Sequence, residues 1–135
     1  MTAPNAGAPD GDAPATSPAR VLLVDDHLDA AELLQILLSN RGFAVTIAGS
    51  VAAALAVAAD ATFDVLVSDL GLPDGSGNDL VRLLKTAGPL AAIALSGSDR
   101  AADIEESRAA GFDAHLSKPV SIDRLVQTIL VVARQ

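Results

Sequence analysis

The feature that most constrains the fold is a regular alternation of short apolar runs with longer amphipathic segments. Residues 21–24 form an unbroken apolar run, which is typical of a strand buried on both faces of a sheet. Further strands are predicted at the mostly apolar segments 44–48, 65–68, 91–95 and 114–116. A helix is predicted after each run, and the first has a stripe of apolar residues at helical spacing: Ala30, Leu33, Leu34, Leu37 and Leu38. This alternation predicts an α/β fold with a parallel sheet covered by helices on both faces.

The chain of 135 residues is long enough for one compact domain. Residues 1–19 consist mostly of Ala, Pro, Gly, Asp, Ser and Thr with nothing to bury, and this composition predicts a disordered tail or an inter-domain linker. The folded domain is therefore expected over residues 20–135. Within it, residues 71–78 are rich in Gly, Pro, Asp and Ser and are predicted to form a loop, and a polar helix is predicted over 99–110.

The charge of the chain excludes several classes of partner. The formal net charge is -8, and the few Lys and Arg residues are scattered, so no basic patch for nucleic acid or an anionic membrane is expected. There is no Cys, which excludes disulfides and thiolate metal sites. Neither a signal peptide nor an apolar stretch of membrane-spanning length is visible, so a cytoplasmic location is expected.

Polar residues come directly or shortly after four of the five predicted strands. Asp25 and Asp26 follow the first strand, Asp69 the third, Ser96 the fourth and Lys118 comes after the fifth. Parallel strands bring their carboxyl ends to one edge of the sheet, where working sites of such folds lie. Three neighbouring carboxylates repel one another, and a hard divalent cation such as Mg²⁺ would compensate them.

This set of groups suits phosphoryl transfer. A carboxylate can attack a phosphoryl group to form an acyl phosphate. The reaction needs positioning and neutralisation of the phosphoryl oxygens, which Mg²⁺, a lysine and a hydroxyl donor supply together. His27 follows the acidic pair, but oxygen is the preferred ligand of Mg²⁺, so His27 is interpreted as a residue of the first helical turn.

Four segments closely resemble the receiver domains of response regulators. They are VDD at 24–26, VLVSDLGLPDGSG at 65–77, ALSG at 94–97 and AHLSKP at 114–119. The resemblance covers residues 20–135. It implies a receiver with the flavodoxin-like (βα)5 fold, a doubly wound five-stranded parallel sheet of strand order 2-1-3-4-5.

The resemblance implies a role for each matching residue. Asp69 is the phosphoacceptor, and Mg²⁺ is held by Asp25, Asp26, Asp69 and the backbone carbonyl of Gly71. Gly77 turns the loop toward the third helix.

The resemblance also assigns the phosphate-binding groups. Lys118 pairs with Asp69 and then with the phosphoryl group, and Ser96 hydrogen-bonds it. The bond before Pro119 is expected to be cis. His115 stands where the family commonly has Tyr or Phe, a ring that swings inward on activation. Two interpretations of His115 stay open: a switch residue, or a partly buried strand residue whose ring is satisfied.

The implied function is a phosphoacceptor in a two-component phosphorelay. The partner is a histidine kinase or a histidine phosphotransfer protein, and the switching surface is the fourth helix, fifth strand and last helix. The receiver catalyses only its own phosphorylation and dephosphorylation, so it is not expected to be an enzyme in the usual sense. It would be a stand-alone receiver or one from a hybrid histidine kinase.

Two other functions are weighed against this one. Phosphatases similar to haloacid dehalogenases also use an Asp nucleophile, but they need a second acid where Gly71 stands, and they place the nucleophile after the first strand. A degenerate receiver that only binds a partner would lack at least one of Asp26, Asp69 and Lys118, and all three are present.

Overall fold

The computed structural model describes residues 19–133, so the tail predicted over 1–19 lies outside the described residues except for Ala19. The elements are, in chain order, β1 (Arg20–Val24), α1 (Leu28–Ser39), β2 (Ala44–Ala48), α2 (Val51–Asp60), β3 (Val65–Asp69), β4 (Gly71–Leu72), β5 (Gly75–Ser76), α3 (Gly77–Ala87), β6 (Ala91–Ser96), α4 (Ala101–Ala110), β7 (Ala114–Ser117) and α5 (Ile122–Val132). Among these helices none is long and apolar enough to pass through a lipid bilayer.

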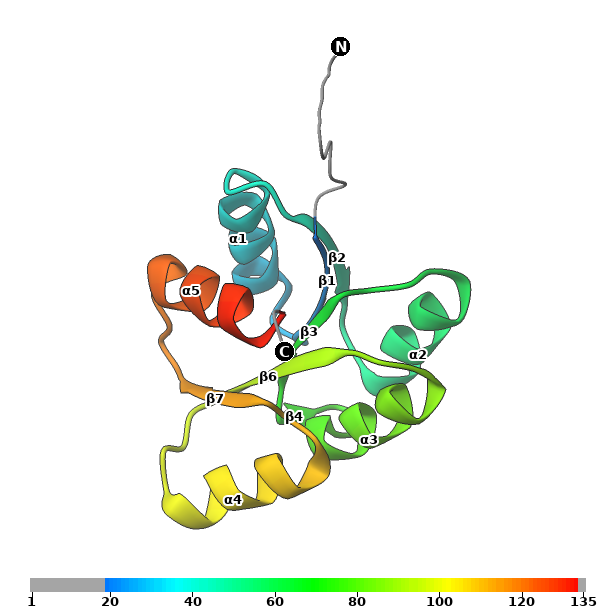
Figure 1. Cartoon of the computed structure of the whole chain (residues 1–135), viewed down its shortest axis with the longest axis vertical. Helices are drawn as coiled ribbons and strands as arrows, with labels where there is room; N and C mark the ends of the chain where they lie inside the picture. The colour runs from blue at the N-terminus through cyan, green and yellow to red at the C-terminus, as the bar shows by residue number, and fades with distance from the viewer. Residues whose placement is uncertain (1–18, 134–135) are drawn as a thin grey trace.

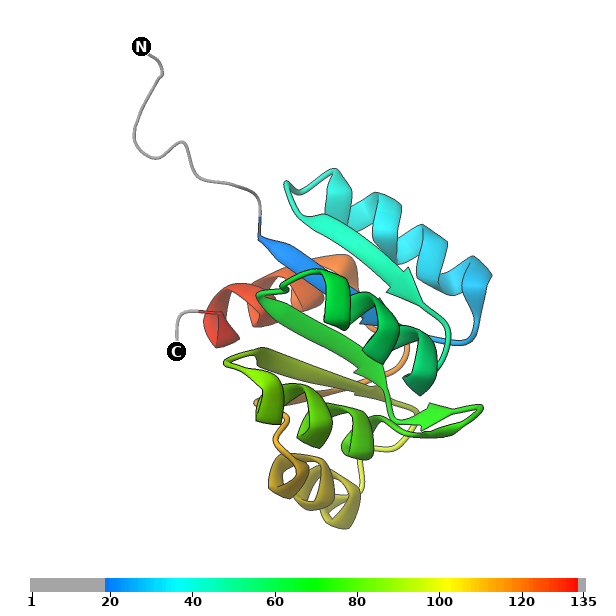
Figure 2. The same cartoon turned by 90° about the vertical axis from the view of Figure 1, so that its right-hand side faces the viewer.

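The main sheet has five parallel strands in the order β2-β1-β3-β6-β7. The predicted fold class is therefore confirmed, because β6 and β7 are the fourth and fifth strands of the predicted order 2-1-3-4-5. The helices cover both faces, with α1 and α5 on one side and α2, α3 and α4 on the other (Figure 1). Figure 2 looks onto α2 and α3, with the strands behind them.

The alternating side chains of each strand fill two separate cores. On β1, Val21 and Leu23 pack with α1 and α5, whereas Leu22 and Val24 pack with α2 and α3. The same division continues in β3 and β6, since successive side chains of a strand point to opposite faces. These central strands are buried on both sides, which explains why they appear in the sequence as unbroken apolar runs.

The structure differs from the sequence-based expectation in three places. In α1 the buried positions are Ala31 and Leu38, whereas Leu33, part of the predicted apolar stripe, is 57% exposed. Helix α4 begins at Ala101 rather than at Asp99. Ser98 Oγ donates to the Asp103 carboxylate (2.5 Å), and this bond holds the residues before α4 in a loop. Residues predicted as a loop after β3 instead contain the antiparallel hairpin β4–β5 and the first residues of α3.

Gly77 is the first residue of α3 and lies against the end of β3. Its amide donates to the carbonyl of Leu70 (2.9 Å), and a Cβ added here would collide with the backbone oxygen of Asp69. Its φ is not in the left-handed region, so glycine is required here by lack of space rather than by conformational freedom. This close approach fixes the point at which the chain passes from β3 to α3, immediately beside Asp69.

We expect Gly77→Ala to destabilise the fold by about 1–3 kcal/mol, because the added methyl group must push the Asp69 backbone away. Denaturant unfolding followed by circular dichroism would measure this. Gly88→Ala is the matched control, since nothing lies within 4 Å of the Cβ it would add. Equal stability of the two variants would contradict the steric role of Gly77.

Candidate functional site

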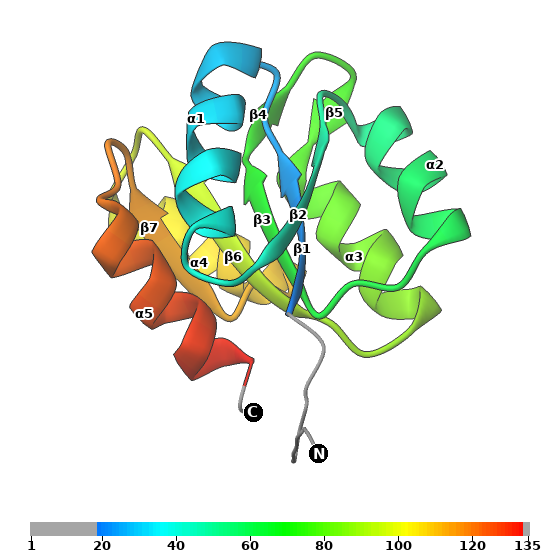
Figure 3. The ribbon, with the colours of Figure 1, turned by 90° about the horizontal axis from the view of Figure 1, so that it is seen from above.

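The carboxyl ends of four neighbouring strands meet at one edge of the sheet. Val24 is paired with Ser68, Asp69 with Leu95, and Ser96 with Ser117. The residues at and just after these ends therefore lie next to one another, as predicted. Figure 3 shows this edge at the top of the molecule, with the β4–β5 hairpin extending beyond β3.

Asp69 and Asp25 are buried side by side at this edge. Asp69 is 7% exposed and Asp25 is 3% exposed. The ammonium of Lys118 lies 2.5 Å from Asp69 Oδ1 and 3.8 Å from Asp25 Oδ2. One ammonium thus faces two buried carboxylates, which leaves the pair with an excess of negative charge.

The charge imbalance affects the titration of Asp69. Burial, together with the neighbouring charge of Asp25, raises the pKa of the Asp69 carboxyl above its ordinary value of 3.8, although Lys118 acts in the opposite direction. A second positive charge would relieve this cost of ionisation. The site is therefore suited to bind a cation.

Asp26 and His27 complete the acidic side of the site. Asp26 is more exposed than Asp25, and the backbone amide of His27 donates to Asp25 Oδ1 (2.9 Å). The ring Nδ1 of His27 lies 3.3 Å from Asp25 Oδ1 and 3.4 Å from Asp26 Oδ1. His27, interpreted from the sequence as a residue of the first helical turn, is the N-cap residue immediately before α1. Its ring faces the carboxylates of Asp25 and Asp26, which could not be predicted from the sequence.

Together these residues could hold a divalent cation. Asp25, Asp26, His27 and Asp69 each offer one ligand atom, and these atoms lie within 4.8 Å of one another. Three of the four donors are carboxylate oxygens, the ligands that hard divalent cations prefer. Gly71, the predicted carbonyl ligand, is an exposed residue at the start of β4, two positions beyond Asp69.

Ser96 lies at the end of β6 and is half-buried. Its carbonyl accepts from the amide of Lys118 (2.7 Å), which joins the ends of β6 and β7. Its hydroxyl oxygen accepts from the amide of Ser98 (3.0 Å), so its own O–H remains free to donate to a ligand. The peptide bond between Lys118 and Pro119 is cis.

His115 connects β7 to α4 and to the loop after β6. Its Nε2 lies 2.9 Å from the carbonyl of Ser98, so this nitrogen donates, and its Nδ1 lies 3.0 Å from the hydroxyl of Ser107. Ser107 is 1% exposed, and its single hydroxyl hydrogen can be donated either to this Nδ1 or to the carbonyl of Ile104, which lies 2.9 Å away. Nothing in the sequence pattern marks Ser107, because a serine in a polar helix normally faces water.

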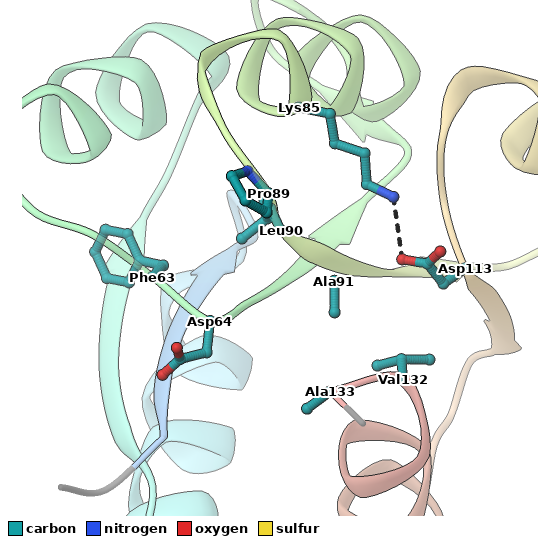
Figure 4. A pocket seen from close by; sticks show the side chains of 9 residues that line it. All are labelled: Phe63, Asp64, Lys85, Pro89, Leu90, Ala91, Asp113, Val132 and Ala133. Atoms are coloured by element: carbon teal, nitrogen blue, oxygen red, sulfur yellow. Dashed lines mark hydrogen bonds and ion pairs between the residues drawn. The ribbon is translucent and has the colours of Figure 1, made fainter. Parts of the chain in front are cut away.

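A pocket of about 460 Å³ lies at the opposite end of the sheet, near the beginnings of β3 and β6 (Figure 4). Its lining includes Phe63, Leu90 and the ion pair between Lys85 and Asp113 (3.1 Å). None of the predicted site residues lines it. The candidate site is therefore the polar edge around Asp69 rather than this cavity.

Comparison with known proteins agrees with this site. The family model of the response regulator receiver domain matches residues 21–130. The chain belongs to this family. It is thus a receiver domain of the two-component signalling type, and the resemblance inferred from its motifs is confirmed.

Two curated relatives illustrate the match. The receiver is 34% identical over 119 residues to the probable transcriptional regulatory protein TcrX of Mycobacterium tuberculosis. The matched region covers 87% of the receiver and 51% of TcrX. It is 38% identical over 119 residues to the virulence sensor protein BvgS of Bordetella pertussis. That matched region covers 82% of the receiver and 10% of BvgS. The chain spans about half the length of the first curated relatives that it matches.

Solved structures have the same fold. The chemotaxis protein CheY4 of Vibrio cholerae is 28% identical with a TM-score of 0.81, over 85% of the receiver and 98% of CheY4. A response regulator of Burkholderia pseudomallei, solved with a phosphorylated aspartic acid, a calcium ion and citrate, is 27% identical with a TM-score of 0.79, over 86% of the receiver and 69% of that chain.

Asp69→Asn should stabilise the metal-free receiver at neutral pH. Because the pKa of Asp69 is raised in the folded state, the contribution of this group to stability is fully present below its ordinary pKa of 3.8 and is lost as the pH rises through the folded pKa. The amide cannot ionise, so the variant avoids this loss, and its advantage should vanish toward pH 3.8. Thermal unfolding over a pH series in the presence of a chelator would measure it.

The control for this experiment is Asp79→Asn, which removes an exposed carboxylate from α3. It should show no comparable gain at neutral pH. An Asp69→Asn variant that is less stable than the wild type at neutral pH would mean that the ion pair with Lys118 outweighs the burial of charge.

Proposed function

We propose that this receiver accepts a phosphoryl group on Asp69 from a phosphohistidine of a histidine kinase or a histidine phosphotransfer protein. The observation that carries the proposal is the contact of Lys118 with Asp69 (2.5 Å) beside the buried Asp25. A buried carboxylate with a lysine against one oxygen, at the edge of a cluster suited to a cation, is arranged as a nucleophile.

The transfer exchanges one bond to phosphorus for another. A carboxylate oxygen of Asp69 attacks the phosphorus, the bond from phosphorus to the histidine nitrogen breaks, and the imidazole leaves with the electron pair and takes up a proton. Lys118 remains beside the acyl phosphate to neutralise a phosphoryl oxygen, and the free O–H of Ser96 donates to another. Asp25, Asp26, Asp69 and the carbonyl of Gly71 would hold Mg²⁺, which would supply the remaining neutralisation of charge.

We also propose how phosphorylation reaches the surface formed by α4, β7 and α5. The Ser96 hydroxyl contacts the amide of Ser98, and the carbonyl of Ser98 contacts His115. His115 in turn contacts Ser107, one of the two buried residues of α4. A movement of Ser96 toward the phosphoryl group therefore displaces a loop that is bonded to His115, which gives His115 the role of switch residue.

Two other functions receive less support. In the phosphatases that use an Asp nucleophile, a second acid stands two residues later, and here that residue is Gly71. Asp69 ends β3 rather than following β1. A protein that only binds a partner has no need of the buried carboxylates and the lysine between them. We therefore propose self-phosphorylation and self-dephosphorylation as the only catalysis.

Phosphorylation can be tested by intact mass after incubation with acetyl phosphate and Mg²⁺. The wild type should gain one labile phosphoryl group, and Asp69→Ala or a metal-free sample should gain none. Lys118→Ala should slow the reaction by roughly 100-fold, because a donor to the developing charge is lost. If there is no adduct, and beryllofluoride leaves the amide signals of Ser96 and His115 unchanged, the phosphoacceptor role is wrong.

The proposed switch predicts a specific effect of Ser107→Ala. The variant should lose about 1–3 kcal/mol of stability, because the ring Nδ1 of His115 loses its partner in a half-buried position. It should also reduce the beryllofluoride-induced amide shifts in α4 while leaving those of Ser96. Thr86→Ala, which removes an exposed hydroxyl from α3, is the control. Unchanged α4 shifts in Ser107→Ala would exclude this route.

A further inference from the structure

Asp74, in the turn of the β4–β5 hairpin, is bound to the beginning of α2. Its Oδ1 accepts from the amide of Val51 (2.8 Å), and its Oδ2 accepts from the amide of Ala52 (2.9 Å). The next amide, that of Ala53, donates to the hydroxyl of Ser50 (3.0 Å). The first three amides of α2 are thus satisfied, two of them by a residue more than twenty positions away in the sequence.

The electrostatics of this contact favour the charged carboxylate. The amides of Ala52 and Val51 donate to Asp74 and lower its pKa below the ordinary 3.8, although the side chain is exposed. The carboxylate also lies at the positive end of the α2 dipole. Asp74 therefore stays ionised at neutral pH, and both of its oxygens remain acceptors.

The hairpin is short and is held mainly by its neighbours. It has only two paired positions, Gly71 with Ser76 and Leu72 with Gly75, and an isolated pair of this length is not stable alone. At one end Gly77 packs against Asp69, and along its side Gly75 lies so close to Val51 that an added Cβ would be 3.3 Å from that side chain. At the turn of the hairpin, the two hydrogen bonds that Asp74 accepts from α2 attach the hairpin to this helix.

We propose that Asp74 is a positioning residue that fixes the β4–β5 hairpin on α2 and thereby holds the Gly71 carbonyl in place for the divalent cation. Gly71 lies in the hairpin, three residues before Asp74 and two after Asp69. A ligand carbonyl on an unsupported hairpin would have to be ordered at the moment of binding, and that ordering would weaken the affinity. This inference rests on the proposed function, because it concerns the same cation site.

The test is Mg²⁺ affinity in the full chain, measured by titrating Mg²⁺ into metal-free protein and following the amide signals of Asp25 and Gly71. Asp74→Ala should raise the dissociation constant for Mg²⁺ roughly 10-fold. Asp74→Asn should have a smaller effect, since the amide oxygen still accepts one bond. The Mg²⁺ concentration for half-maximal phosphorylation by acetyl phosphate should rise in parallel, while the rate at saturating Mg²⁺ stays near that of the wild type.

Ser50→Ala is the matched control. It removes a cap from the same helix without touching the hairpin, so it should lower the melting temperature and leave the Mg²⁺ affinity unchanged. Asp79→Asn controls for the loss of one nearby surface charge. Circular dichroism establishes that each variant is folded, and Asp74→Asn carries the test if Asp74→Ala is not.

The outcomes separate this inference from the function it rests on. Equal Mg²⁺ affinity in the wild type and both Asp74 variants would overturn the positioning role, as would an equal loss in Ser50→Ala. A wild type that binds Mg²⁺ but forms no phosphoryl adduct would contradict the proposed function alone, because the titration still measures the effect of Asp74. A wild type that binds no Mg²⁺ would overturn both.

Discussion

The structure depends on two carboxylates that are kept in a position where their charges repel. Asp25 and Asp69 are almost fully buried, and Lys118 lies between them as a shared counter-charge. Such an arrangement is unfavourable on its own, and it persists because the strands that carry it are packed on both faces. Stability from the apolar cores thus maintains a site whose excess negative charge makes it suited to bind a cation.

Periodicity made most of the fold predictable. The strands buried on both faces appear as unbroken apolar runs, and a parallel sheet necessarily gathers at one edge the residues that come directly after those runs. Asp25, Asp69, Ser96 and Lys118 could therefore be placed together from the sequence. The hairpin after β3 could not be predicted, because its few residues have the composition of a loop and are ordered by contacts with α2 and β3.

The contacts that were not predicted are of two kinds. Some join elements that are distant in the sequence, and others depend on the direction in which a side chain points. The ring of His27 turns toward the acidic pair, Ser107 turns inward to His115, and Asp74 reaches the amides of α2. His, Ser and Asp are all common on protein surfaces, and the neighbouring residues in the sequence favour an exposed position for each of the three. The tertiary arrangement decides which of these side chains has a partner. Hydrophobic periodicity and turn composition in the sequence therefore do not predict these contacts.

The division of each central strand between two cores has an evolutionary consequence. Val21 and Leu23 belong to the side of α1 and α5, while Leu22 and Val24 belong to the side of α2 and α3. Substitutions on one side can accumulate without disturbing side chains on the other, since the backbone of the sheet stands between them. One flank of the molecule can thus diverge to suit a new binding partner while the opposite flank, and the chemistry at the strand ends, is inherited unchanged.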